Sequence, residues 1–177
     1  MNRGEVLLSI ARAAIAEGFG AAPGSPPRVA WLDEKRAVFV TLKKHGVLRG
    51  CIGQLSPRFT LFEAVRHAAR AAAFEDPRFP PRTRDELPEL ELDISVLSLL
   101  EPLDVSTEEE ALAALRPGVD GVVLTHGHRS GVFIPEVWKE LPDSRDFLAQ
   151  LKRKAGLPPT WLPGTRVERF TAEVFSS

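Results

Sequence analysis

The sequence predicts an α+β fold with a mainly antiparallel sheet flanked by helices. Segments with the two-residue alternation typical of strands occur in pairs joined by tight turns, most clearly over residues 37–52. Helical segments lie between these pairs without the regular strand–helix–strand repeat of a parallel sheet. The length of 177 residues fits one domain, and we therefore expect residues 1–177 to form a single domain.

The first half of the chain contains two predicted helices around one hairpin. Apolar residues at three- and four-residue spacing over 6–15 predict a helix that ends near Gly18. Residues 37–42 and 47–52 predict the two arms of a hairpin, turned at His45-Gly46. Thr60 and Glu63 have the spacing of a capping box, which predicts a helix over 61–74.

The second half predicts a further hairpin and two further helices. Apolar residues alternate with polar ones over 90–96, which predicts a strand with one buried face. The other predicted elements, in chain order, are a helix capped by Ser106 or Thr107 and running to Leu115, hairpin arms at 122–124 and 132–134 around a polar tip at 126–131, a helix capped by Asp143 and ended by Gly156, and one final strand through Phe170, Ala172 and Val174.

Composition excludes several classes of protein. The 23 basic and 24 acidic side chains give a net charge of −1, whereas a protein that coats DNA needs a surplus of Lys and Arg. The single cysteine excludes an intramolecular disulfide and any cluster held by several thiolates. Neither a signal peptide nor an 18-residue apolar run is present, so we expect a cytoplasmic protein without membrane contact.

The segment Leu48-Arg49-Gly50-Cys51-Ile52-Gly53 is the first candidate for chemistry. On a regular strand Arg49 and Cys51 would share one face, where a guanidinium favours the thiolate and can hold an anion. Gly50 and Gly53 would let backbone or ligand approach closely. The alternative interpretation is a small buried cysteine that packs as a hydrophobic residue, with glycines that serve bulges.

A proline-rich loop is the second candidate. In Asp76-Pro77-Arg78-Phe79-Pro80-Pro81, each residue before a proline is held extended, so a carboxylate, a guanidinium and a ring are presented rigidly. The loop either lines a cleft or forms an ion-paired corner, and the residues alone leave both open.

Two weaker signals remain. His126 and His128 are two residues apart, but no third ligand accompanies them, so no metal site is predicted. Residues 58–84 carry six arginines against three acids. This indicates either a solvated face or a basic surface that attracts an anionic ligand or RNA.

The hexapeptide at 48–53, preceded by Phe39-Val40-Thr41-Leu42 and followed by the loop at 76–81, resembles the AMMECR domain family, of which LRGCIG is the hallmark. Further similar segments are, in chain order, 90–99, 120–122, 131–137 and 154–157. The resemblance implies a larger and a smaller lobe with a cleft between them and the hexapeptide near that cleft. One departure is Glu136, since Ile134-Pro135-Glu136-Val137 stands where the family usually has Leu-Pro-Gln-Val.

The resemblance also carries the expectations about function. A stand-alone copy is similar to the AMMECR component of the AmmeMemoRadiSam system, which implies a Memo-like protein and a radical SAM enzyme as partners, and RNA modification has been suggested for the family. The resemblance implies no particular cofactor and no particular reaction. An enzyme, a non-catalytic partner and an RNA-associated module therefore remain open.

The candidate residues fall into two groups. We expect Cys51, Arg49 and Asp76 to be catalytic if the protein is an enzyme, and the remaining candidates to bind a ligand. The ligand-binding candidates are Leu48, Gly50, Gly53, Arg78, Phe79 and Glu136.

Overall fold

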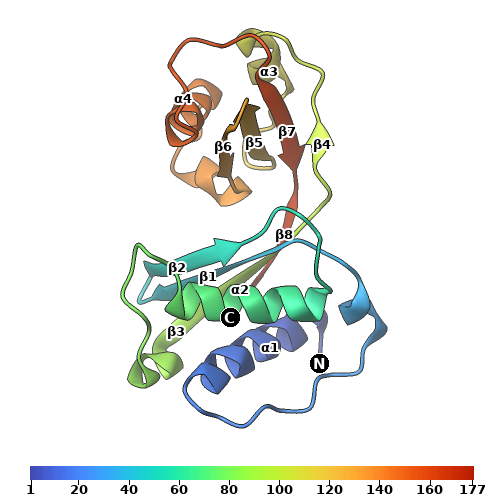
Figure 1. Cartoon of the computed structure of the whole chain (residues 1–177), viewed down its shortest axis with the longest axis vertical. Helices are drawn as coiled ribbons and strands as arrows, with labels where there is room; N and C mark the ends of the chain where they lie inside the picture. The colour runs from blue at the N-terminus through green and yellow to red at the C-terminus, as the bar shows by residue number, and fades with distance from the viewer. The chain divides into compact units, whose positions relative to one another are not determined.

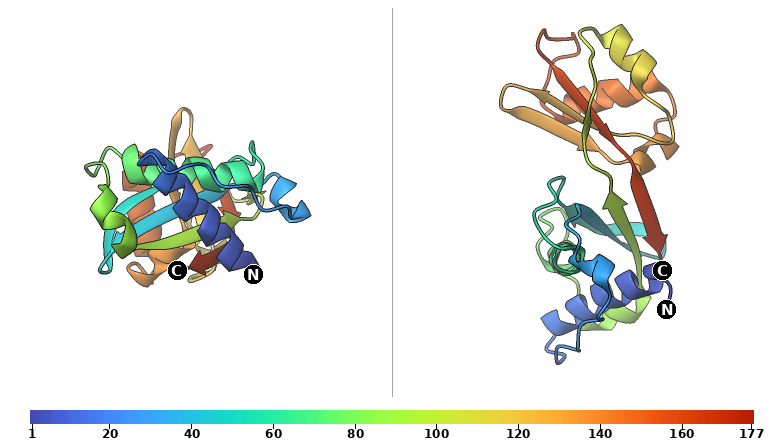
Figure 2. Two further views of the ribbon diagram at one scale, coloured as in Figure 1. Left: turned by 90° about the horizontal axis from the view of Figure 1, so that it is seen from below. Right: turned by 90° about the vertical axis from the view of Figure 1, so that its right-hand side faces the viewer.

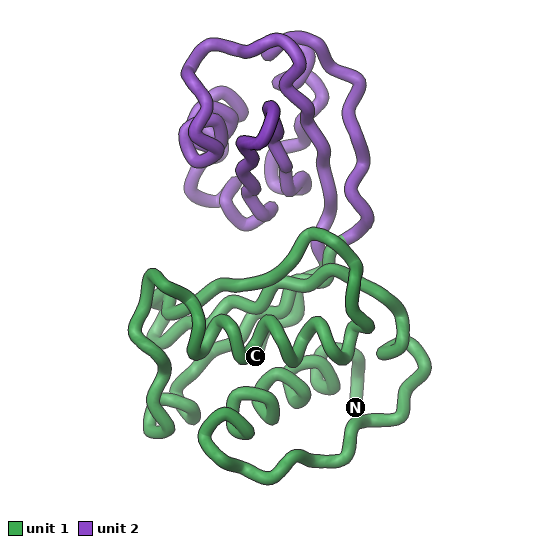
Figure 3. Tube along the Cα trace, in the orientation of Figure 1, with its two compact units in different colours: residues 1–97, 173–177 green, residues 98–172 purple.

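The computed structural model describes all residues 1–177 and divides them into two compact units (Figure 3). The larger unit comprises Met1–Leu97 and Glu173–Ser177, and the smaller one comprises Ser98–Ala172. Each unit has its own four-stranded sheet and its own hydrophobic core. The predicted α+β class with antiparallel pairing is confirmed.

The larger unit packs two helices on one face of its sheet. Its elements are α1 (Arg3–Gly18), the short 3₁₀ helix η1 (Ala30–Asp33), β1 (Val38–Lys44), β2 (Val47–Gly53), α2 (Leu61–Phe74), the 3₁₀ helix η2 (Arg84–Glu89), β3 (Leu90–Leu97) and β8 (Ala172–Ser176). The strand order is β2-β1-β3-β8, so β2 is an edge strand. Figures 1 and 2 show α1 and α2 on the same face, where Leu7, Val65 and Ile94 share one core.

The smaller unit surrounds a core in which Trp138 stacks on Phe147 at 3.7 Å. Its elements are β4 (Glu101–Pro102), α3 (Glu108–Ala114), β5 (Gly121–His126), β6 (Arg129–Phe133), the 3₁₀ helix η3 (Pro135–Lys139), α4 (Ser144–Lys154) and β7 (Arg166–Phe170). The strand order is β4-β7-β5-β6. The indole of Trp138 donates to the backbone oxygen of Asp120 at 2.7 Å, which satisfies its polar atom inside the core.

The predicted helix starts are confirmed. Thr60 and Glu63 form the expected capping box of α2, and Asp143 accepts from two backbone amides at the start of α4. Thr107, one of the two predicted caps, accepts from the amide of Glu110 and begins α3.

Two strand predictions were wrong in detail. The final strand is two strands in different sheets, β7 and β8, because Thr171 leaves the ladder and bonds to Ser98 through its amide and its carbonyl. The second hairpin also extends further than expected. Its strands run to His126 and from Arg129, so only Gly127 and His128 form the turn.

The first hairpin contains a bulge, which the alternative interpretation of the hexapeptide allowed without placing it at Arg49. His45 and Gly46 have φ of 50° and 76°, as a tight two-residue turn requires. Leu42 then pairs with Gly50 but Lys43 pairs with Leu48, so Arg49 is an extra residue in β2. A bulge interrupts the alternation of side chains, and the expectation that Arg49 and Cys51 share a face is therefore wrong.

Gly50 allows α2 to lie directly on β2. A β-carbon at this position would stand 2.2 Å from the backbone oxygen of Ala72. No real contact is that short, so any larger residue must push the helix and the strand apart. Gly50 thus sets the spacing of α2 and β2.

We expect Gly50→Ala to lower the free energy of unfolding by about 1–3 kcal/mol, because the added methyl group overpacks a helix–sheet contact. Denaturant unfolding followed by circular dichroism measures this change. Gly24→Ala is the matched control, since a β-carbon at Gly24 meets nothing within 4 Å. Gly24→Ala should change the free energy of unfolding by no more than about 0.5 kcal/mol. An equal loss of stability in both variants would contradict the packing argument.

Candidate functional site

The loop after α2 is tied to the hexapeptide through the carboxylate of Asp76. Asp76 is only 4% exposed. Its Oδ2 accepts from the backbone amide of Cys51 at 3.0 Å, and its Oδ1 accepts from the backbone amide of Arg78 at 3.1 Å. The guanidinium of Arg78 adds two further bonds, from Nε at 3.1 Å and from Nη2 at 2.8 Å.

Arg78 completes the attachment from the other side. Its Nη2 also donates to the backbone oxygen of Cys51 at 3.4 Å. Both backbone groups that Cys51 directs away from β1 are thereby bonded by one carboxylate and one guanidinium. We call this arrangement of Asp76, Arg78 and the Cys51 backbone the edge clamp, because it takes the place of a further strand beside β2.

The clamp fixes the charge of Asp76. The hydrogen bonds from Arg78 hold the pKa of this carboxyl well below its usual range; burial opposes them, and the amide of Cys51 adds to the lowering. The same pairing raises the pKa of Arg78. A carboxylate with so depressed a pKa and so many donors is a poor general base near neutral pH.

The thiol of Cys51 accepts a hydrogen bond from a neighbouring hydroxyl. Cys51 pairs with Thr41 across the β1–β2 ladder, and the hydroxyl of Thr41 donates to Sγ at 3.3 Å. The side chain is neither fully buried nor freely exposed. Leu48 lies on this same face, because it pairs with Lys43, two residues from Thr41.

Arg49 lies in different surroundings from Cys51. It lines a hollow of about 430 Å³ together with Lys44, Arg82 and Glu86. Its Nε is buried and has no hydrogen-bond partner. The bulge therefore directs the predicted anion-binding residue away from the predicted nucleophile.

A second hollow runs between α2 and the end of β2, and we call it the hexapeptide groove. Its volume is about 230 Å³. It is lined by Arg36, Ala37, Val38, Ile52, Gly53, Gln54, Ser56, Phe59, Ala64, His67, Ala68, Ala71 and Glu75. Along α2 the lining positions follow a helical stripe in which three of the four residues are alanine, so the groove owes its space to small side chains.

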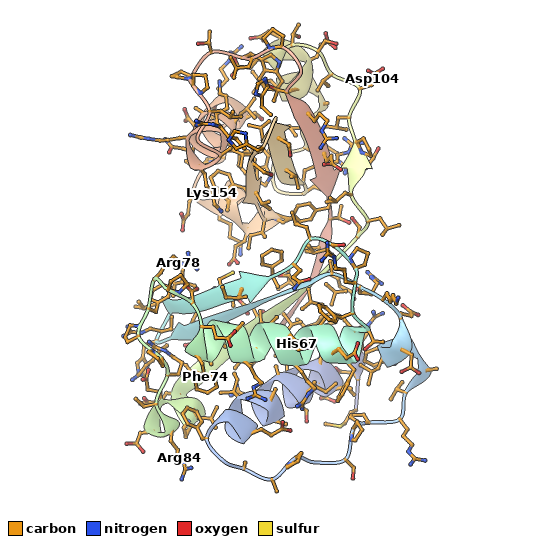
Figure 4. The ribbon with its side chains drawn as sticks, in the orientation of Figure 1. His67, Phe74, Arg78, Arg84, Asp104 and Lys154 are labelled. Atoms are coloured by element: carbon orange, nitrogen blue, oxygen red, sulfur yellow. The ribbon has the colours of Figure 1, made fainter.

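The rings of His67 and Phe59 line part of the groove. His67 lies on α2, as labelled in Figure 4, and its ring centroid is 5.0 Å from that of Phe59. Gly53, on the strand side, cannot be replaced easily, because a β-carbon there would lie 2.2 Å from the backbone oxygen of Val38. The groove thus joins two hexapeptide residues, Ile52 and Gly53, to polar and aromatic groups.

The structure brings several of the predicted site residues together. Cys51, Asp76 and Arg78 form one cluster, and Phe79 stands beneath the Arg78 guanidinium at 5.3 Å. Glu136 belongs to the smaller unit, where its carboxylate is 3.9 Å from Lys139 in η3.

One of the two histidines and several of the arginines singled out in the sequence have polar partners. His126 Nε2 lies 3.1 Å from the backbone oxygen of Pro163. No group of three His, Cys, Asp or Glu residues is placed to hold a metal ion. Among the arginines of the basic segment, Arg66 pairs with Glu17 at 2.7 Å and Arg82 with Glu86 at 2.9 Å.

Sequence reasoning missed most of the groove. Gln54, Ser56 and His67 were not among the candidates, nor were the alanines of α2. The stripe Ala64, Ala68, Ala71 is visible in the sequence as a run of small residues at helical spacing. What the sequence does not show is that this stripe faces the end of β2.

No helix of the chain has both the length and the hydropathy needed to cross a membrane.

Comparison with known proteins gives one consistent result. The AMMECR1 family model matches residues 8–175. A protein of Methanothermobacter thermautotrophicus is 41% identical over 98% of this chain and 94% of its own length, and one of Thermococcus gammatolerans is 44% identical over 97% and 89%. The crystal structure of an uncharacterised protein from Pyrococcus horikoshii superposes with a TM-score of 0.90 at 40% identity, covering 98% of this chain and 91% of that one.

We expect Asp76→Asn to lower the free energy of unfolding by about 2–3 kcal/mol near neutral pH, because charge-assisted bonds to Arg78 and Cys51 are lost. The folded-state pKa of Asp76 is depressed, so its contribution is fully present above the unfolded-state pKa of about 3.9 and is lost as pH falls below it. The difference between wild type and variant should therefore be constant from about pH 5 to 8 and shrink below about pH 4.

Glu75→Gln is the control for this prediction, since Glu75 is the adjacent acid but is exposed. Chemical denaturation at several pH values measures both variants. If the loss of unfolding free energy in Asp76→Asn did not shrink in acid, the charge of Asp76 would not be its cause. The shape of the side chain would then account for the stabilisation.

Proposed function

Because the chain belongs to the AMMECR1 family, we propose that it is a ligand-binding protein that uses the hexapeptide groove and acts together with a Memo-like protein and a radical SAM enzyme. The observation that carries the binding role is the groove itself, a hollow of about 230 Å³ beside Ile52 and Gly53. Small-molecule sites typically combine such an apolar hollow with a few polar groups that fix orientation.

The contents of the groove fit this description. Part of its lining is apolar, formed by Val38, Ile52 and the alanines of α2. The polar groups are one arginine, one amide, one hydroxyl, one imidazole and one carboxylate, from Arg36, Gln54, Ser56, His67 and Glu75. Opposite charges are thus balanced, which favours a ligand of low net charge.

The edge clamp supports binding more than independent catalysis. Asp76 is held anionic and fully occupied as an acceptor, and the hydroxyl of Thr41 is the side-chain group bonded to the Cys51 thiol. A nucleophilic thiol ordinarily needs an adjacent base. The clamp instead makes the end of β2 rigid, which is what a preorganised binding site requires.

The two partners are proposed from the family resemblance. A protein that binds a ligand but has no evident catalytic base would deliver that ligand to the enzymes that perform the reaction, or would provide the binding site for it. RNA binding is the less favoured proposal, because Arg66, Arg78 and Arg82 are each paired with a carboxylate.

We expect Ala71→Leu to abolish small-molecule binding in the groove, because the larger side chain fills space that the alanine leaves open. The measurement is a ¹⁵N-resolved NMR titration of the full chain with a set of ring-containing fragments. In the wild type, shifted amides should cluster at Gly53, Gln54 and His67, and in the variant those shifts should disappear.

Ala13→Leu is the matched control, because Ala13 lies on the exposed face of α1 and the substitution is the same. It should bind fragments as the wild type does. If no fragment shifts the groove amides, or if Ala71→Leu binds unchanged, the groove is not a ligand site.

Thiol chemistry at Cys51 is a second candidate, favoured by the bond from the Thr41 hydroxyl to Sγ at 3.3 Å. A donated hydrogen bond stabilises a thiolate. On this proposal iodoacetamide should modify the native chain faster than the urea-unfolded chain, and Thr41→Val should slow the reaction about three- to tenfold. Thr41→Ser retains the hydroxyl and should react like the wild type. Alkylation that becomes faster on unfolding would contradict the thiol proposal.

A further inference from the structure

The outer edge of β2 directs backbone groups away from β1 at Cys51 and at Gly53, the two outward positions nearest the groove. In an antiparallel ladder, successive residues of an edge strand direct their N–H and C=O groups alternately toward and away from the partner strand. The amide of Cys51 reaches Asp76 and therefore points away from β1, whereas the amide of Gln54 donates to Val38 on β1 at 3.2 Å. By this alternation Gly53, two residues after Cys51, also directs its N–H and C=O away from β1.

The two outward positions differ in their partners. The edge clamp bonds both groups of Cys51. Gly53 lines the hexapeptide groove, and β1 is the only strand beside β2, so no strand covers its outward groups and a ligand in the groove can reach them. The groove thus contains a donor and an acceptor from the same residue, held side by side on a rigid strand.

This free edge is too short to receive another strand. Toward the N-terminus of β2, Asp76 and Arg78 already occupy the next outward position. In the other direction β2 ends at Gly53. A peptide added as a strand needs several consecutive outward residues for its ladder, so a small molecule fits the edge better than a peptide does.

The geometry selects among small molecules. A ligand that pairs with both groups of Gly53 must present an acceptor and a donor on the same edge. A trans amide, as in a peptide bond, directs its N–H and C=O to opposite sides. An amide inside a six-membered ring is held cis, so its N–H and C=O lie on one edge and can pair with both groups.

The walls of the groove favour a flat ring. Ala68 and Ala71 on α2 and Ile52 on β2 provide apolar surfaces, and Phe59 with His67 provides aromatic ones. The volume of about 230 Å³ is below the range of about 300–1,000 Å³ typical of drug-sized ligands. The ligand is therefore small.

We propose that the hexapeptide groove binds a small planar heterocycle with a cyclic amide, of the kind found in oxo-pyrimidines and oxo-purines, and that this amide pairs with the N–H and C=O of Gly53. The inference rests on the proposed function, because it assumes that the groove is the ligand site. It adds the chemical class of the ligand and the backbone groups that recognise it.

The test compares uracil and hypoxanthine with 1,3-dimethyluracil, which keeps the ring and both carbonyls but has no N–H to donate. Each is titrated into the full ¹⁵N-labelled chain, and dissociation constants are taken from the shifts of the groove amides. We expect uracil or hypoxanthine to move the Gly53 amide, and 1,3-dimethyluracil to bind at least about tenfold more weakly, because a donor to the Gly53 carbonyl is lost. Ala71→Leu should remove the binding and Ala13→Leu should retain it.

The outcomes separate this inference from the proposed function. If dimethyluracil binds as tightly as uracil, or if other fragments bind in the groove while uracil and hypoxanthine leave Gly53 unmoved, the cyclic-amide inference is wrong and the groove remains a ligand site. If neither these compounds nor any fragment shifts the groove amides, both proposals fail.

Discussion

The buried carboxylate of Asp76 holds the end of α2 and the edge of β2 in one fixed arrangement. Its acceptance of the Cys51 amide and its pairing with Arg78 satisfy backbone groups that an edge strand otherwise leaves open to water or to another chain. Because the loop carrying both residues follows α2 directly, the clamp also fixes where that helix ends. The Arg49 hollow and the hexapeptide groove both border the strand held in this way.

Small residues explain both the close contact between α2 and β2 and the hexapeptide groove beside it. Gly50 allows α2 to touch β2 at Ala72, and further along the same helix Ala68 and Ala71 leave room beside Ile52. One helix therefore packs tightly at one point and leaves a hollow at the next. The glycines of the hexapeptide are explained by backbone contact: Gly50 meets the helix, and Gly53 meets β1.

The clamp also decides which chemistry the hexapeptide can support. A carboxylate that accepts from two backbone amides and a guanidinium orients its neighbours more readily than it takes a proton. Arg49, displaced by the bulge, does not stand on the face of Cys51. The arrangement is consistent with recognition, in which rigid backbone and small side chains matter more than an acid–base pair.

The sequence by itself determined the local structure and the family. Caps such as Thr60 with Glu63 and the His45-Gly46 turn act over a few residues, and their hydrogen bonds can be inferred from spacing alone. Only the tertiary structure decided which residues meet. The bulge at Arg49, the division of the last strand into β7 and β8, and the groove between α2 and β2 depend on pairings between distant segments. Asp76 and Cys51 were both candidates from the sequence, but their bond spans 25 residues and is set by how the helix between them packs.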